Sequence, residues 1–172
     1  MAAQDVYLGL GGNIGDTKEI FRSVVNTLKG FSDCEWVGIS KLYRTSPVSS
    51  IPQPHFLNAA CHLRTTSNLE FFFERIESLE KAHGKIDKTK DEPRTIDIDL
   101  LFFGKEVRMD QKLSLPHPRW SERLFVLIPL FDLTPVIHFP LNDLKFDEIN
   151  LLEKIRTFDN KQNECVLFDS FL

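Results

Sequence analysis

The stretch "EPRTIDIDLLFFG", residues 92–104, decides the fold, because it predicts a buried strand that also carries charged side chains. Residues 95–103 are apolar and partly β-branched, and they lie between a proline and a glycine, which is typical of such a strand. Successive side chains of a strand point to opposite faces, so Ile96, Ile98 and Leu100 share one face.

The other face of this strand carries Asp97 and Asp99, which lie about 7 Å apart along the strand. Aspartate is depleted in strands, and like charges held close in a half-buried setting repel each other. A divalent cation, nearby Arg or Lys, or exposure to water at a sheet edge could compensate for them. Because Leu101 and Phe103 continue the same face as apolar residues, we favour a metal site of hard oxygen ligands.

The composition indicates one globular domain with a proper core. The chain has 172 residues, of which 42% are hydrophobic and 27% charged. Its net charge of −4 gives no general attraction to nucleic acid or to an anionic membrane. No apolar run is long enough to span a membrane, and the three distant cysteines suit a reducing compartment. We therefore expect a cytoplasmic protein with no nucleic-acid or membrane partner.

The remaining sequence completes the order strand, helix, strand, strand, helix, strand. The predicted elements are a strand over 5–12, a helix over 16–29, strands over 34–46 and 56–65, a helix between Ser67 and Gly84, and the strand over 95–103. This order is that of the ferredoxin-like βαββαβ arrangement, an α+β fold with helices on one face of a mostly antiparallel sheet.

Further elements follow at the C-terminal end. We predict a hairpin around Gly104 and extra helices within 116–135 and 150–158. We assign residues 1–158 to one domain and residues 159–172 to a C-terminal tail or the start of a linker.

Both helices of the βαββαβ unit have predicted N-terminal caps. Asp16, with Glu19 three residues later, caps the first helix. Ser67 and Glu70 form a capping box for the second.

The turn "GLGGNIG", residues 9–15, resembles a dinucleotide-binding loop only weakly. Ile14 occupies the place of the third glycine, and Asp16 and Glu19 would discourage a phosphate at the helix start. We interpret the segment as a tight turn that closes against the active face.

Cations gather on both sides of the aspartate strand, at Lys85, Lys88, Lys90 and Arg94, and at His117, Arg119 and Arg123. Such a run often forms only a solvated surface. Beside a magnesium site, however, these cations would neutralise phosphate oxygens that the metal does not reach. We therefore predict a nucleotide triphosphate site, with the charged loop 85–93 as a mobile lid.

A second substrate needs another pocket, which the segments "RTSPV" and "PHFLNAA" could line. Phe56 and Phe125 offer stacking faces for a flat heteroaromatic ring, and Asn58 offers an amide for its edge. The alternative places both phenylalanines in the core and Asn58 in a turn, and these residues alone leave that choice open.

Six segments in the same order resemble the 6-hydroxymethyl-7,8-dihydropterin pyrophosphokinases. They are "LGGNIGD", "YRTSPV", "FLNAA", "EPRTIDIDLLFFG", "LSLPHPRW" and "PLFDLTP", and the resemblance as a whole spans about residues 4 to 140. The resemblance implies a ferredoxin-like enzyme of folate biosynthesis. Such an enzyme transfers the β,γ-pyrophosphoryl unit of ATP, its co-substrate, to the hydroxymethyl group of the pterin and releases AMP.

The resemblance also implies roles for individual residues. Asp97 and Asp99 would hold two Mg²⁺ ions, and Arg94 and Lys85 would act on the transferring group. The ATP site would further include Glu80, Lys88, Ile98, Lys112, His117 and Arg123. The pterin pocket would comprise Thr45, Pro47, Val48, Phe56, Asn58 and Phe125.

Four positions depart from the family pattern and bear on the lid and the rate. Lys85 stands where the family often has arginine, Asp91 and Glu92 replace a common aromatic residue and glycine, and Phe56 replaces a frequent tyrosine. Lysine supplies charge without a bidentate fork.

Two other functional classes remain as alternatives. A metal-dependent nucleotidyltransferase also uses a D-x-D pair, but the pterin-like segments argue against it. A non-catalytic RNA-binding module is disfavoured by the acidic charge and by the missing aromatic sheet motifs. The resemblance also implies that the domain could be fused to, or work beside, dihydropteroate synthase, or be fused to dihydroneopterin aldolase.

Overall fold

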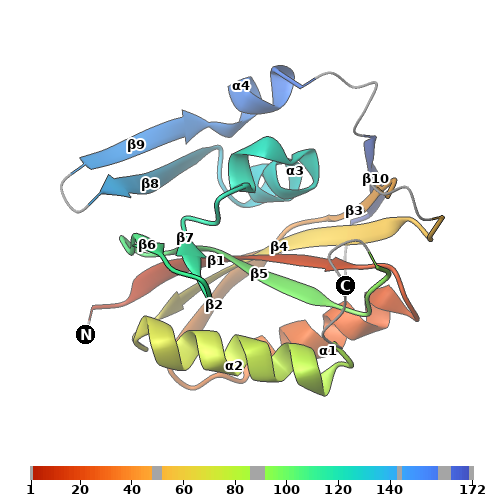
Figure 1. Ribbon diagram of the computed structural model, residues 1–172, viewed down its shortest axis with the longest axis horizontal. Helices are drawn as coiled ribbons and strands as arrows, with labels where there is room; N and C mark the ends of the chain where they lie inside the picture. The colour runs from red at the N-terminus through yellow and green to blue at the C-terminus, as the bar shows by residue number, and fades with distance from the viewer. Residues whose placement is uncertain (1, 48–51, 86–91, 143–144, 159–163, 171–172) are drawn as a thin grey trace.

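The computed structural model describes residues 2–47, 52–85, 92–142, 145–158 and 164–170 (Figure 1). It is a mixed α+β structure with an antiparallel sheet at its centre, as predicted. Among the described residues, none of the helices is long and apolar enough to cross a membrane.

The central sheet has six strands, with β1 between β4 and β5. The strands are β1 Gln4–Gly12, β2 Cys34–Ile39, β3 Leu42–Thr45, β4 Phe56–Thr65, β5 Asp97–Phe103 and β10 Cys165–Asp169. The order is β10-β3-β4-β1-β5, and β2 pairs with β4 beside β3. All pairs are antiparallel, which brings the end of β1 beside the start of β5.

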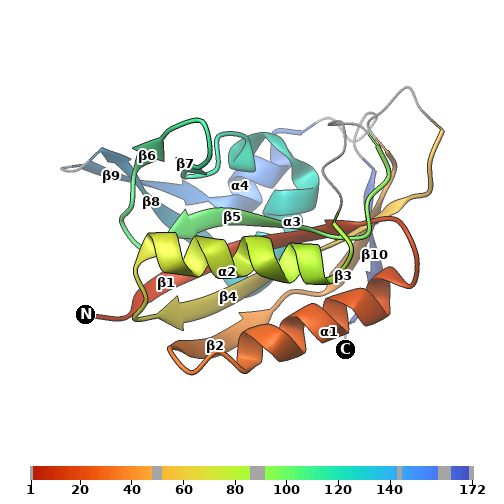
Figure 2. The same ribbon diagram turned by 60° about the horizontal axis from the view of Figure 1, so that its bottom comes forward.

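Two helices, α1 Thr17–Lys29 and α2 Leu69–Ala82, cover one face of the sheet (Figure 2). Their apolar stripes are buried against the strands, because apolar residues recur at helical spacing along each helix. Phe21 and Leu28 of α1, and Phe72 of α2, are completely buried in this core.

The opposite face is covered by later elements, above the sheet in Figure 1. These are a 3₁₀ turn over Trp120–Glu122, α3 Leu124–Leu133, the hairpin of β8 Val136–Asn142 and β9 Lys145–Asn150, and α4 Leu151–Arg156. A second core lies here, with Leu101, Trp120 and Leu127 among its buried residues. The expectation of helices on one face thus holds for α1 and α2, whereas the extra helices lie on the other.

The cap of α1 is as predicted, whereas that of α2 differs by one residue. The carboxylate of Asp16 accepts a hydrogen bond from the Glu19 N–H at 3.1 Å. In α2 the cap is Asn68, whose side-chain oxygen accepts from the Phe71 N–H at 2.9 Å. The Ser67 hydroxyl instead donates to Asp33. Because Asn and Ser are about equally good caps, the tertiary bond to Asp33 decides between them.

A β-bulge changes the predicted faces of the aspartate strand. Leu100 pairs with Leu8 and Phe102 with Tyr7, so Leu101 is an extra residue without a partner on β1. The prediction that Phe103 shares the aspartate face is therefore wrong, because one inserted residue reverses the alternation beyond it. Phe103 packs instead on the helix side, with its ring 5.6 Å from that of Phe72.

The predicted strand over 34–46 is broken at Ser40. The Ser40 hydroxyl accepts from the Ala60 N–H at 2.8 Å and donates to the Lys41 carbonyl at 2.7 Å. These bonds to a side chain replace part of the regular ladder, so β2 and β3 form separate strands.

The C-terminal part also differs from the sequence-based expectation. The hairpin of β6 Arg108–Met109 and β7 Ser114–Leu115 turns at residues 110–113 rather than at Gly104. The β8–β9 hairpin was not predicted. Within the segment 159–172, residues 165–169 form β10, which pairs with β3 and extends the central sheet.

Gly12, the last residue of β1, allows two backbone segments to approach closely. A Cβ atom at this position would lie 2.4 Å from the Thr95 carbonyl oxygen, whereas one at Gly9 would meet no atom closer than 3.6 Å. Gly12 therefore sets the separation between the ends of β1 and β5, and a side chain there would push them apart.

We predict that Gly12→Ala lowers the free energy of unfolding by about 1–3 kcal/mol, the usual cost of overpacking. Urea denaturation would measure this change. Gly9→Ala is the matched control from the same strand and should cost clearly less. Equal losses for the two variants would contradict the steric argument.

Candidate functional site

The site begins where α2 ends beside the start of β5. The carboxylate of Glu80 is buried, with 6% of the residue exposed. Its Oε1 atom accepts from the Ile98 N–H at 2.6 Å and from Lys85 Nζ at 2.7 Å. Burial raises the pKa of Glu80, although both hydrogen bonds oppose this shift. Glu80 thus fixes the last turn of α2 to the aspartate strand.

Asp97 lies at the centre of an ion-pair cluster. Lys85 Nζ lies 3.0 Å from its Oδ1 atom, and the guanidinium of Arg94 pairs with its Oδ2 atom. Burial tends to lower the pKa of Lys85, but the hydrogen bond to Glu80 and the charge of Asp97 outweigh it, so that pKa is raised. Lys85 is therefore held as a cation.

Asp99 has a less balanced environment than Asp97. Burial, together with the negative charge of Asp97, raises the pKa of Asp99, whereas His117 and Arg123 act against this shift. Within the described ranges, no Lys, Arg or His nitrogen lies within ion-pair distance of its carboxylate. Asp99 is thus a carboxylate in a half-buried setting that its neighbours compensate only at longer range.

His117 and Arg123 act electrostatically on Asp99 from the segment between β7 and α3. The Nδ1 atom of His117 accepts from the Arg119 N–H at 3.2 Å, so in the neutral ring the proton resides on Nε2. Burial lowers the pKa of His117 and also that of Arg123. The backbone N–H of His117 donates to the Leu101 carbonyl at 2.9 Å, which fixes this segment to β5.

Several residues that were predicted to line a heteroaromatic pocket lie next to this cluster, on β3 and β4. The Asn58 side chain is buried, and its Nδ2 atom donates to the Thr45 hydroxyl at 2.9 Å. Phe56 is half-buried, with its ring centre 5.8 Å from the Arg94 guanidinium carbon. Phe56 therefore lies near the ion-pair cluster and two positions before Asn58 on β4.

Other predicted site residues are placed less centrally. Pro47 follows β3 and is partly buried, and Phe125 lies at the start of α3, 5.5 Å from the Arg123 guanidinium. Lys112 lies in the β6–β7 turn, where its Nζ atom is 2.9 Å from Glu77 of α2. Val48 and Lys88, with most of the predicted lid, lie outside the described residues.

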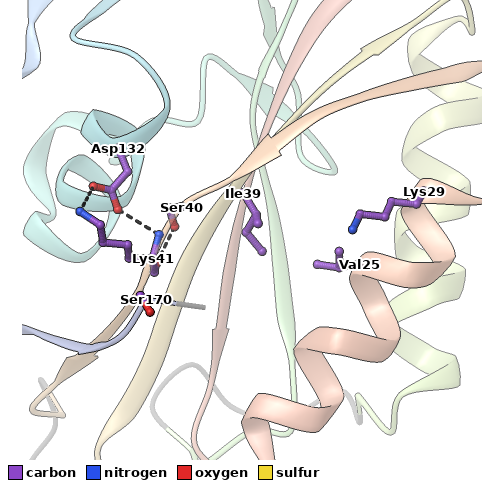
Figure 3. Close-up of a pocket in the computed structure, with 7 residues that line it drawn as sticks. All are labelled: Val25, Lys29, Ile39, Ser40, Lys41, Asp132 and Ser170. Atoms are coloured by element: carbon purple, nitrogen blue, oxygen red, sulfur yellow. Dashed lines mark hydrogen bonds and ion pairs between the residues drawn. The ribbon is translucent and has the colours of Figure 1, made fainter. Parts of the chain in front are cut away.

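A hollow of about 280 Å³ elsewhere on the surface contains none of the predicted site residues (Figure 3). It is lined by Val25, Lys29, Ile39, Ser40, Lys41, Asp132 and Ser170. Asp132 closes one side by accepting from the Lys41 N–H at 3.0 Å and from the Tyr43 hydroxyl at 2.8 Å. The hollow lies at the edge of the sheet formed by β10 and β3, whereas Asp97 lies on β5, the strand at the opposite edge.

The sequence model of the 7,8-dihydro-6-hydroxymethylpterin-pyrophosphokinase (HPPK) family matches residues 7–135. The chain belongs to this family. The 2-amino-4-hydroxy-6-hydroxymethyldihydropteridine pyrophosphokinase of Bacillus subtilis is 32% identical over 155 residues, which is 90% of each chain. The enzyme of the same name from Helicobacter pylori is 37% identical over 127 residues, which cover 73% of this chain and 78% of the relative.

Longer relatives contain the same domain. The mitochondrial folate synthesis bifunctional protein of Arabidopsis thaliana is 38% identical over 129 residues, which are 75% of this chain and 23% of that protein. A crystal structure of Plasmodium falciparum HPPK-DHPS with pteroate has a TM-score of 0.60 and 15% identity. It covers 90% of this chain, which spans 43% of that protein, and it supports the fold alone.

Asp97 and Asp99, two carboxylates on β5, are oxygen ligands of the kind that suit a hard divalent cation. Within the described ranges, no group of three or more His, Cys, Asp or Glu side chains could hold a metal by itself. Mg²⁺ does not need one, because it commonly uses one or two carboxylates together with substrate phosphates. Asp99, which lacks a close cation partner among the described residues, fits such a ligand.

The sequence interpretation did not single out Asn13, which the structure places beside these residues. It is buried in the turn after β1, with hydrogen bonds to the segments that carry Arg94 and Gln53. The only sequence signal for Asn13 was its place in "GGNIG". That signal is weak, because an asparagine in a glycine turn is usually there for its backbone conformation.

The raised pKa of Asp99 predicts a stabilising substitution. Its ionised carboxylate costs folding free energy above the folded-state pKa and costs none below pH 3.8, where it is protonated in both states. Asp99→Asn should therefore raise the free energy of unfolding at pH 7 by about 0.5–2 kcal/mol, and the gain should shrink as the pH falls. Urea denaturation without metal between pH 7 and pH 4 would measure it.

Asp97→Asn is the matched control, since it removes a carboxylate that is paired with Lys85 and Arg94. This variant should lose stability at pH 7. Equal destabilisation by both substitutions would show that Asp99 is compensated as well as Asp97.

Proposed function

We propose that this chain transfers the pyrophosphoryl group of ATP to 6-hydroxymethyl-7,8-dihydropterin, which gives the pterin diphosphate and AMP in folate biosynthesis. The match to the pyrophosphokinase family over residues 7–135 carries this proposal. The pairing of Asp97 with both Lys85 and Arg94, and the buried Asn58 amide with its bond to Thr45, support it.

The phosphate half of the proposed site is the cluster around β5. Arg94 and Lys85 would contact the transferring group, with His117 and Arg123 on the triphosphate. Each now pairs with or faces a carboxylate, which keeps these cations ordered before the substrate arrives. The rest of the ATP site would comprise Glu80, the backbone at Ile98, Lys88 and Lys112.

The pterin half would lie on β3 and β4. The Asn58 amide would pair with the edge of the ring, and its bond to Thr45 fixes which way the amide points. Phe56 and Phe125 would stack on the ring faces. Pro47 and Val48 would complete the wall.

We further propose that Asp97 and Asp99 hold two Mg²⁺ ions when ATP is bound. When bound, Mg²⁺ would neutralise phosphate charge and bring the triphosphate oxygens to the carboxylates. Binding would require Asp97 to give up part of its pairing with Lys85 and Arg94. The released cations would then contact phosphate oxygens instead.

In the reaction, the pterin hydroxyl oxygen attacks the β-phosphorus in line and AMP leaves. The new P–O bond replaces the bond between the β-phosphorus and the oxygen that bridges to the α-phosphate, and the hydroxyl proton passes to solvent. Positioning and charge neutralisation supply most of the rate in such transfers. We assign no dedicated protein base, and the roles of Arg94 and Lys85 are electrostatic.

The strand order supports a ferredoxin-like classification. Counting β2 and β3 as one interrupted strand, the sheet has the βαββαβ order with β1 and β4 central. We place the enzyme in the cytoplasm, as a domain that extends through β10. Because longer relatives such as the Arabidopsis thaliana bifunctional protein contain this domain, it could also work beside dihydropteroate synthase.

The reaction type predicts a specific nucleotide product. Incubation with ATP, Mg²⁺ and 6-hydroxymethyl-7,8-dihydropterin should yield AMP only when the pterin is present, and chromatography of the nucleotides would measure it. ADP as the product would indicate an ordinary kinase and overturn the proposal. A pterin that lacks the hydroxymethyl group is the control and should give no AMP.

The metal proposal predicts that both aspartates are required. Asp97→Asn and Asp99→Asn should each lower kcat by about a hundredfold or more, since each removes a charged ligand. EDTA should abolish AMP formation in the wild type, and added Mg²⁺ should restore it. Asp147→Asn, at an exposed position of β9, is the control. Retained activity in the two site variants would disprove the metal site.

A further inference from the structure

Asn13 is a buried polar residue to which the mechanism above gives no task. Only 6% of it is exposed, and it lies in the turn between β1 and α1. Burial of a carboxamide is costly unless its hydrogen bonds are made, so its partners indicate what it holds in place.

On one side, Asn13 is bonded to the backbone of Arg94. Its Oδ1 atom accepts from the Arg94 N–H at 2.9 Å, and its own N–H donates to the Arg94 carbonyl at 2.9 Å. Both peptide groups of Arg94 are thereby fixed to the turn. The guanidinium of Arg94 pairs with Asp97, so the turn fixes the backbone position from which this side chain extends to Asp97.

On the other side, Asn13 is bonded to the segment that leads into β4. Its Nδ2 atom donates to Gln53 Oε1 at 2.9 Å and to the Pro54 carbonyl at 3.0 Å. This segment runs directly into Phe56 and Asn58. The orientation of the Asn13 amide is determined by backbone groups, because the Arg94 N–H can only donate and the Pro54 carbonyl can only accept.

Among the described residues, no other side chain forms this set of hydrogen bonds between the three segments, which are the β1–α1 turn, the segment before β5 and the segment before β4. Asn13 thus connects the segment before β5, where the proposed phosphate half begins, to the segment before β4, where the proposed pterin half begins. The two halves approach each other where Arg94 lies 5.8 Å from the Phe56 ring centre. A shift of one segment would therefore change the separation of the two substrates.

We propose that Asn13 is a positioning residue, which fixes the pterin half of the site relative to the phosphate half. The inference rests on the proposed function. In-line transfer needs the reacting atoms about 3–3.5 Å apart, and a misplacement of about 1 Å can cost a hundredfold in rate. Asn13 contacts neither substrate in this proposal, so its loss affects transfer rather than the binding of either substrate alone.

Asn13→Asp tests this with little change in size. The carboxylate keeps an acceptor for the Arg94 N–H but opposes the Pro54 carbonyl with an oxygen. We expect kcat to fall about tenfold to a hundredfold, while the Kd of the pterin alone and of a non-hydrolysable ATP analogue alone change less than about threefold. Calorimetric titration gives the two Kd values, and AMP formation gives kcat.

Asn26→Asp, on the exposed face of α1, is the matched control and should leave kcat unchanged. Gln53→Met removes the acceptor of the Asn13–Gln53 hydrogen bond and leaves Asn13 unchanged. It therefore tests the same contact if the Asn13→Asp variant does not fold. It should lower kcat less than Asn13→Asp does. The double variant should lose less than the product of the two single effects, because both remove one shared interaction.

Three results would overturn the inference. One is an increase of one Kd with kcat retained, which would make Asn13 part of a single substrate pocket. Another is a lowered Tm with normal kcat and Kd at 20 °C, which would make it a stabilising residue only. The third is full multiplicativity of the Asn13 and Gln53 effects. If the wild type itself forms no AMP from ATP and the pterin, the proposed function fails, and this inference fails with it.

Discussion

The buried carboxylate of Glu80 is the interaction on which the site depends. A single oxygen of this group accepts from the backbone of Ile98 and from the side chain of Lys85. The first bond fixes the end of α2 to β5, and the second directs Lys85 towards Asp97. An interior carboxylate is costly to bury, and it is retained here because both partners lie within hydrogen-bond distance. The helix, the strand and the cation are thus placed by one group.

Around this anchor, the charges are paired unequally. Asp97 has two close cations, whereas Asp99 has only the longer-range influence of His117 and Arg123 among the described residues. The fold therefore carries an electrostatic cost at one position. Functional sites commonly hold such costs, because groups that must bind a ligand cannot also be fully satisfied within the protein. The rest of β5, from Leu100 to Phe103, is buried apolar strand and supplies the compensating stability.

The sequence predicted those features that depend on local pattern. The aspartate strand, the Asp16 cap and the order of the first six elements follow from side-chain alternation, capping and spacing. The choice of Asn68 over Ser67, the break at Ser40 and the role of Asn13 depend on hydrogen-bond partners 20 to 81 positions away, which local pattern does not contain. The β8–β9 hairpin was missed because its strands are short and include a proline at residue 140. Lys85 could be placed near the site by sequence, but its bond to Glu80 could not.

The bulge at Leu101 affects both the packing of the core and the position of a residue of the candidate site. The extra residue leaves the pairing with β1, and its carbonyl accepts from the backbone of His117, which lies near Asp99. The same residue turns Phe103 towards α2. The strand is therefore sensitive to its length as well as to its composition. Deleting one residue between Asp99 and Gly104 would keep every type of side chain, yet it would exchange the two faces and remove the docking point of His117. Over evolutionary time, insertions and deletions are expected to accumulate in the surface loops and to be absent from this short run.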